Sequence, residues 1–348
     1  MLRANHRVAI LLHGGVRGNR GKTGLALLRF SEAEIAVIID HDTAGQDVVE
    51  LTGIHRPVPI VASVAEALAY QLDVLAIGIA PTGGSLPWEW RAELKQAIAA
   101  GLSIANGLHT RLREDAELTA LLHPGQWLWD MRQEPENLPI GTGQAKHLPC
   151  LRVLTVGTDM SVGKMSTSLA LHRACVRRGL RSKFLASGQA GLMIAGDGVA
   201  LDAVRVDFAS GAIEQLLLMF GQDHDILHLE GQGSLLNPSS TATLPLIRGS
   251  QPTHLILVHR AGQTHLSRLP DVPIPPLANV VALYEAIAHA AGSFAPAPVV
   301  GIALNTHHLD ETSAQAAIAA VQTETGLPCT DPIRGSADPL VDAILADH

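Results

Sequence analysis

The chain has 348 residues, and at a prior of about 150 residues per domain this length predicts two domains. Hydrophobic residues make up 47% of the chain and charged residues 17%, which excludes an intrinsically disordered protein. The net charge of −8 and the sequence pI near 6.1 disfavour a basic surface for nucleic acid or an anionic membrane. The three cysteines, Cys150, Cys175 and Cys329, show no C-x-x-C spacing and indicate a reducing compartment, so we expect a cytoplasmic protein.

Strand-like and helical patterns alternate through roughly the first 130 residues, which is typical of βαβ units and a parallel sheet. The apolar runs are well short of the roughly 20 residues that span a bilayer. The expected strands are 8–12, 35–39, 58–61, 74–79 and 102–105, and the expected helices lie near 22–30, 63–71, 88–100 and 111–122.

Residues 131–149 lose this periodicity and carry prolines among polar residues, as an interdomain connection does. We therefore predict an α/β domain at 1–135, a linker at 136–149 and a second α/β domain at 150–348. The second domain has expected strands at 151–156, 183–186, 225–230, 254–259 and 299–304, and expected helices near 164–179, 210–221, 280–291 and 311–325.

A glycine-rich loop, RVLTVGTDMSVGKMS, joins the first strand of the second domain to a helix. The glycines let backbone N–H groups face an anion, the helix N-terminus adds its dipole, and Lys164 adds a positive charge. This pattern predicts a phosphate-binding loop, although an ordinary strand-turn-helix is the alternative. The candidate cofactor contacts are Gly157, Thr158, Asp159, Gly163, Lys164 and Ser166.

This loop departs from the commonest phosphate-binding loop in two ways. The span from Gly157 to Gly163 is one residue longer than G-x-x-x-x-G, and Met165 occupies the position where a hydroxyl would bind Mg²⁺. A standard Mg-ATPase is therefore disfavoured.

A second candidate group ends the expected strand 225–230. Glu230 stands where a Walker B carboxylate would lie, and a turn-capping acid is the alternative. His228 shares a strand face with Glu230, so it is a candidate base or orienting partner, or else a core histidine. We take Glu230 and His228 as the candidate catalytic residues.

The first domain has its own glycine-rich loop, HGGVRGNRGKTG, followed later by Asp40 at the end of the next strand. Its candidate phosphate contacts are Gly15, Gly21, Lys22 and Thr23, with a purely structural turn as the alternative. The 17 histidines show no H-x-x-x-H spacing with a glutamate on a helix, and His307 and His308 are adjacent and would point apart. We therefore predict no metal site.

The pair GTDMSVGK and LEGQG resembles the motifs of dethiobiotin synthetase and its relatives, in which an Asn after a late strand reads the adenine. Asn305 in VVGIALNT stands in the matching context. Beyond this class, the chain resembles the D-glutamate N-acetyltransferase family over nearly its full length. The matching stretches are 21–30, 80–98, 107–112, 129–132, 186–196, 204–216, 249–259 and 327–345.

This resemblance implies transfer of acetyl from acetyl-CoA to the amine of D-glutamate or a similar small acidic amino acid. It also implies a Rossmann-like N-terminal domain and a P-loop NTPase-like C-terminal domain. Amide donors would come from the turn at Ser187 and Gln189, and Arg205 with Asp207 would face the same loops. These four residues are the candidate substrate contacts.

Two other functions remain open from the residues alone. One is an ATP- and Mg-dependent carboxylate-activating or phosphotransfer enzyme of the dethiobiotin-synthetase type. The other is a non-catalytic nucleotide-binding regulator. In each case we expect a small-molecule ligand and no nucleic-acid or membrane partner, and a homo-oligomer is left open.

Overall fold

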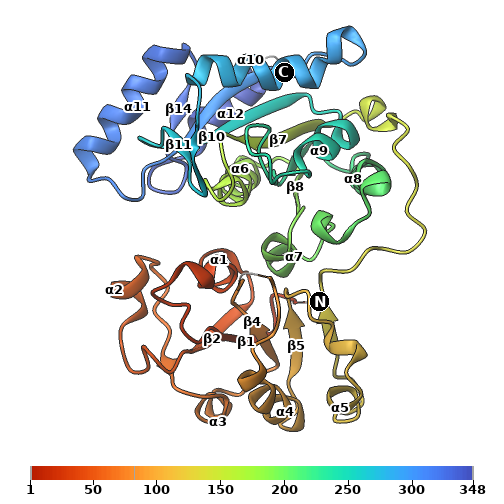
Figure 1. The fold of residues 1–348 in the computed structure, drawn as a ribbon, viewed down its shortest axis with the longest axis vertical. Coiled ribbons are helices and arrows are strands. Elements are labelled where there is room, and N and C mark those ends of the chain that lie inside the picture. The colour runs from red at the N-terminus through yellow and green to blue at the C-terminus, as the bar shows by residue number, and fades with distance from the viewer. Residues whose placement is uncertain (1, 82, 347–348) are drawn as a thin grey trace. The chain divides into compact units, whose positions relative to one another are not determined.

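The computed structural model describes residues 2–81 and 83–346, apart from the side chain of Asn19 (Figure 1). Thr82, in one of the matching stretches, and 347–348, at the end of the predicted second domain, lie outside the described residues. The chain divides into two compact units, Met1–Gln133 with Gln189–Ala203, and Glu134–Gly188 with Val204–His348. The short segment Gln189–Ala203 thus belongs to the first unit, although in sequence it lies within the predicted second domain.

The first unit is a six-stranded sheet in the order β3-β2-β1-β4-β5-β6, with every neighbouring pair parallel. This order is that of a Rossmann fold, so the expected α/β class is confirmed for this unit. Its strands are β1 (Arg7–Leu11), β2 (Glu34–Ile39), β3 (Ile60–Val61), β4 (Val74–Ile77), β5 (Ser103–Asn106) and β6 (Leu128–Asp130). Its helices are α1 (Lys22–Phe30), α2 (Val48–Thr52), α3 (Val64–Ala67), α4 (Arg91–Ala99), α5 (Ala116–Thr119) and α7 (Gln189–Ala195).

The second unit has another six-stranded parallel sheet, in the order β14-β13-β10-β7-β9-β8, and a two-stranded antiparallel hairpin. The sheet strands are β7 (Leu151–Gly157), β8 (Ser182–Leu185), β9 (Ile226–Leu229), β10 (His254–Arg260), β13 (Val299–Asn305) and β14 (Cys329–Thr330), and the hairpin is β11 (His265–Leu266) with β12 (Leu269–Pro273). The helices are α6 (Lys164–Arg177), α8 (Val206–Phe220), α9 (Thr243–Ser250), α10 (Leu277–His289), α11 (Glu311–Thr325) and α12 (Asp338–Leu345).

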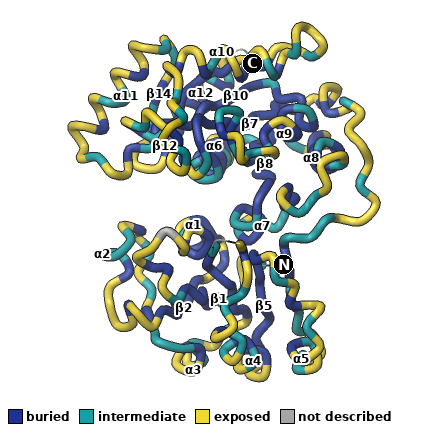
Figure 2. Tube along the Cα trace, in the orientation of Figure 1, coloured by how far each residue is buried: buried dark blue, intermediate teal, exposed yellow. Residues whose placement is uncertain are grey.

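The central strands of both sheets are almost entirely buried, whereas the helices expose one face (Figure 2). All residues of β7 and of β9 are buried, for example. Strands covered on both faces need continuous apolar runs, which is why these segments were recognisable in the sequence. Among the described residues, no helix is both long enough and apolar enough to cross a membrane.

Several elements were not predicted. Helix α7 has the sequence QAGLMIA and helix α9 has TLPLIRGS, and each contains residues of low helix propensity. Helix α12 is short, and its buried side chains Leu340, Val341 and Ile344 pack into the core of the second unit. Tertiary packing, rather than local propensity, stabilises these helices.

Candidate functional site

The phosphate-binding loop of the second unit connects β7 to α6. Strand β7 ends at Gly157 and helix α6 begins at Lys164. Gly163 has φ of +121°, a conformation that side-chain-bearing residues rarely adopt. The first N–H groups of α6 have no intrahelical partners, so the helix presents them and the positive end of its dipole to the loop. Ser166 is half-buried in that turn, as is Met165.

Lys164 is held inside this loop. Its side chain is 6% exposed, and its Nζ donates a hydrogen bond of 2.7 Å to the Asp159 backbone oxygen. Burial lowers the pKa of Lys164 to about 8, although the nearby carboxylates of Asp159 and Glu230 act in the opposite direction. The lysine side chain thus turns back onto its own loop. Burial makes its positive charge unfavourable, and a bound anion would offset that cost.

The Asp159 carboxylate ties the loop to two distant segments. It is 1% exposed, and although burial acts to raise its pKa, hydrogen bonds hold that pKa below its ordinary value. Both carboxylate oxygens accept hydrogen bonds from other groups of the protein, so the Asp159 side chain fixes the loop in place. These donors are Met160 N (2.7 Å), Asn237 Nδ2 (3.1 Å), Gln263 Nε2 (2.8 Å), Ser267 N (2.8 Å) and Ser267 Oγ (2.8 Å).

The start of the loop is anchored to its neighbours by two buried groups. Thr158 Oγ1 lies 2.9 Å from His259 Nδ1, and burial lowers the pKa of His259 to about 4, which keeps this ring neutral. Tyr284 donates from its hydroxyl to the Gly157 backbone oxygen at 2.7 Å. These two contacts fix the start of the loop against β10 and α10.

Arg260 is a basic residue at this loop that sequence reasoning missed. It ends β10, whose neighbour is β7, and its Nη2 donates to the Ser161 backbone oxygen at 3.1 Å. Its Nε is buried and has no hydrogen-bond partner among the described residues. Parallel strands meet a ligand at their carboxyl ends, so a basic residue closing the expected strand 254–259 was the available signal.

Asn305 lies beside Arg260, because the two residues are paired in register between β13 and β10. The Asn305 side chain donates from Nδ2 to the Val162 backbone oxygen at 2.9 Å, and its Oδ1 accepts from His307 N at 3.2 Å. It therefore contacts the back of the phosphate-binding loop.

Glu230 directly follows β9 and lies near Lys164 of the phosphate-binding loop. It is 8% exposed, and its Oε2 accepts hydrogen bonds from the backbone N–H groups of Ser187 (3.0 Å) and Gly188 (3.3 Å). The next residue, Gly231, approaches so closely that an added Cβ would lie 1.7 Å from the Thr155 oxygen and 3.0 Å from Lys164 Cδ. The structure thus brings Lys164, Glu230 and Ser187 together at one edge of the second sheet.

His228 occupies a different environment from Glu230. Its ring is fully buried in β9, and neither nitrogen has a hydrogen-bond partner among the described residues. Burial lowers the pKa of His228 to about 3, and the His172 ring centroid lies 6.4 Å away. A neutral ring without solvent contact is a core residue in this conformation.

The candidate substrate contacts have different local surroundings. Ser187 is buried beside Glu230, with no partner for its hydroxyl among the described residues. Gln189 begins α7 in the first unit, where its side chain packs against Gly107. Arg205 precedes α8 and forms an ion pair of 2.9 Å with Glu134, and Asp207 is exposed in the first turn of that helix.

The glycine-rich loop of the first unit is tightly folded. A Cβ on Gly21 would lie 2.2 Å from the Gly15 backbone oxygen, so close packing alone requires glycine there. Thr23 is buried at the start of α1, and Lys22 before it is exposed. The exposed lysine distinguishes this loop from the one that holds Lys164.

Models of two domain families match the chain. A model described as the P-loop domain of DUF1611, a domain of unknown function, matches residues 139–341, and a model described as its Rossmann-like N-terminal domain matches residues 41–134. The chain belongs to the DUF1611 family. The two-domain α/β architecture, Rossmann-like and then P-loop, is thereby confirmed.

Individual relatives agree with this family. The crystal structure of a DUF1611 family protein from Anabaena variabilis is 63% identical, has a TM-score of 0.95, and is matched over 99% of this chain and 100% of that chain. A protein of Tritonibacter scottomollicae named D-glutamate N-acetyltransferase is 42% identical over 283 residues, 81% of this chain and 84% of the relative. One of the same name from Pseudoalteromonas is 36% identical over 282 residues, 80% of this chain and 83% of the relative. The family resemblance inferred from the motifs is confirmed.

Proposed function

We propose that this DUF1611 protein is an N-acetyltransferase that transfers acetyl from acetyl-CoA to the amine of D-glutamate or a similar small acidic amino acid. The observation that carries the proposal is its similarity to two proteins named D-glutamate N-acetyltransferase over about four-fifths of the chain. Met165 supports it, because a loop without the Mg²⁺-binding hydroxyl suits a ligand that binds without a cation.

The residues at the phosphate-binding loop fit the diphosphate of a coenzyme A molecule. Burial lowers the pKa of Lys164 to about 8, so a bound anion would stabilise the protonated form of this lysine. Arg260 offers a buried Nε–H that has no acceptor among the described residues. The N–H groups of Gly163, Lys164 and Ser166 at the start of α6 would complete the contacts, with Asn305 near the adenine. Acetyl-CoA would supply the acetyl group.

The reaction needs an acceptor for the proton that the amine loses as the C–N bond forms and the thiol leaves. We assign this role to Glu230 rather than to His228, because Glu230 reaches the loop edge whereas the His228 ring is enclosed in the core. The N–H groups of Ser187 and Gly188 fix the Glu230 carboxylate in position. Gln189, Arg205 and Asp207 stay candidates for contacts with the amino acid.

Calorimetric titration of the full-length protein with acetyl-CoA, CoA and ATP, each with and without Mg²⁺, tests the cofactor assignment. We expect acetyl-CoA to bind equally in EDTA and in Mg²⁺. A thiol-release assay with D-glutamate, L-glutamate and D-aspartate then tests the acceptor. Turnover of ATP that depends on Mg²⁺, without release of CoA, would overturn the proposal.

We also place the protein in the cytosol, in a reducing compartment. Its three cysteines are free and buried, and burial raises the pKa of Cys175 to about 11 and that of Cys329 to about 12. Thiols in such surroundings stay protonated and unreactive.

A further inference from the structure

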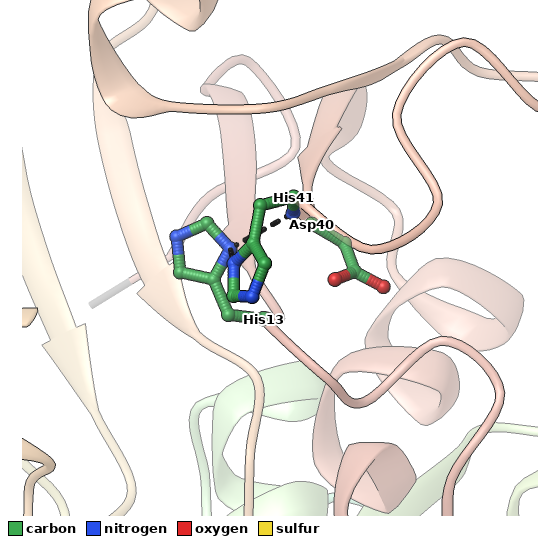
Figure 3. A group of neighbouring side chains, drawn as sticks. All are labelled: His13, Asp40 and His41. Carbon is green, nitrogen blue, oxygen red and sulfur yellow. Dashed lines mark hydrogen bonds between the residues drawn. The ribbon is translucent and has the colours of Figure 1, made fainter.

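Two histidines and an aspartate meet at the carboxyl edge of the first sheet. His13 comes shortly after β1, and Asp40 and His41 come directly after β2, the parallel neighbour of β1. One ligand atom from each of the three side chains lies within 4.8 Å of the others (Figure 3). This group belongs to the first unit, whereas Lys164 belongs to the second.

The outer nitrogens of both rings face carboxylates. His13 Nε2 lies 2.7 Å from Glu93 Oε2, and His41 Nε2 lies 3.2 Å from Asp42 Oδ1. A carboxylate accepts a hydrogen bond, so a neutral ring that donates from Nε2 has its Nδ1 lone pair available to a cation. Glu93 is itself held in place, because its Oε1 accepts a hydrogen bond of 3.1 Å from the Val64 backbone N–H.

The inner nitrogens face each other. His13 Nδ1 and His41 Nδ1 lie 2.9 Å apart, and the His41 backbone N–H also points to His13 Nδ1 at 3.1 Å (Figure 3). This distance is that of a hydrogen bond when one ring carries a proton on Nδ1, and a metal ion bound by both Nδ1 atoms would take the place of that proton. Carboxylates that fix histidine rings through their outer nitrogens are the usual surroundings of metal-binding histidines.

Asp40 supplies negative charge at this point. It is 1% exposed, and its Oδ1 accepts from the backbone N–H groups of Gly14 (2.9 Å) and Asp42 (3.2 Å). Its Oδ2 accepts from Thr43 Oγ1 at 2.8 Å, which leaves that oxygen a second lone pair. The carboxylate is therefore oriented by the loops on either side.

We propose that His13 Nδ1, His41 Nδ1 and an Asp40 carboxylate oxygen bind one divalent cation of the zinc class. Two imidazoles and one carboxylate form a set that suits Zn²⁺ or a similar first-row metal and leaves a coordination position open. The His41 side chain is 58% exposed, which gives the cation access. The sequence predicted no metal site, because no helical pattern carries histidines at metal-binding spacing with a glutamate.

The test uses untagged full-length protein, stripped with a chelator and titrated with Zn²⁺ in competition with a chromogenic chelator. We expect one Zn²⁺ per chain, at least tenfold weaker binding in His41→Ala, and unchanged binding in His55→Ala, which removes an exposed histidine of the same unit. Co²⁺ should give visible absorption bands that His41→Ala abolishes. Because His41 is exposed, this variant should fold even where His13→Ala does not.

Absence of stoichiometric Zn²⁺ binding by the wild type, or equal binding by His41→Ala, would overturn the proposal. A wild type that binds no metal while the two rings titrate together would show that a proton is the shared cation.

Discussion

Replacement of Lys164 by methionine should stabilise the ligand-free protein while destroying its affinity for the cofactor. The pKa of Lys164 is about 8 in the folded chain, against 10.5 for an ordinary lysine. Near pH 7 that difference makes the protonated lysine cost about 3 kcal/mol of folding free energy. The variant also loses the hydrogen bond to the Asp159 oxygen, which lowers its free energy of unfolding by about 1 kcal/mol. We therefore expect Lys164→Met to raise the free energy of unfolding by about 2 kcal/mol.

The pH dependence has a definite sign. Between the folded pKa near 8 and the unfolded value near 10.5, the unfolded chain binds the extra proton, so stability of the wild type rises with pH. The advantage of Lys164→Met should therefore shrink by roughly 2 kcal/mol as the pH goes from about 7 to about 9.5. Urea unfolding at both pH values measures this difference. The exposed Lys146→Met is the control and should change stability by less than about 0.5 kcal/mol at either pH.

Cofactor affinity should respond in the opposite direction. A buried charge on a phosphate contributes about 1.5–3 kcal/mol, so Lys164→Met should raise the Kd for acetyl-CoA at least tenfold. In the wild type, affinity should fall above about pH 8, because the lysine must first gain its proton. A variant that loses stability near pH 7 and still binds acetyl-CoA normally would refute this account of Lys164.

Three further substitutions test the same edge of the second sheet. Glu230→Gln should lower kcat about a hundredfold with little change in Tm, since an amide oxygen can still accept the two backbone N–H bonds; full activity would remove Glu230 as the proton acceptor. Met165→Thr should raise Mg-dependent ATP affinity in calorimetry and leave acetyl-CoA affinity within a few-fold, and no gain for ATP would show that the hydroxyl is not what is missing. Asp159→Asn should cost about 3 kcal/mol in urea unfolding, because its buried donors lose a charged acceptor, whereas the exposed Asp207→Asn should be neutral; equal effects would contradict a fixing role for Asp159.

The sequence could predict the parts of the site that depend on neighbours along the chain. A buried strand, a glycine with a positive φ and a lysine at a helix start are encoded within a few residues, so Gly157, Gly163 and Lys164 were identifiable together. The strand end also marked Glu230, because parallel strands present their last residues at one edge.

Contacts between distant segments were not predictable in this way. Asp159 matched a motif for cofactor contacts, yet its carboxylate is engaged by Asn237, Gln263 and Ser267, which come from loops far along the chain. Strand alternation placed His228 beside Glu230, but alternation does not indicate that helices cover that face completely.

The cluster of His13, Asp40 and His41 could not be predicted from the sequence either. Metal motifs are recognisable in a sequence when one helix or turn carries the ligands at fixed spacing, because that element alone sets their geometry. Here the ligand-bearing residues end two strands, and Glu93, which orients one ring, lies on a helix that follows two further strands. Only the parallel pairing of β1 with β2 turns these separate positions into one cluster. A ligand site of this kind is therefore found by comparing the residues at the carboxyl ends of neighbouring strands, because the strand order decides which of them can share a ligand.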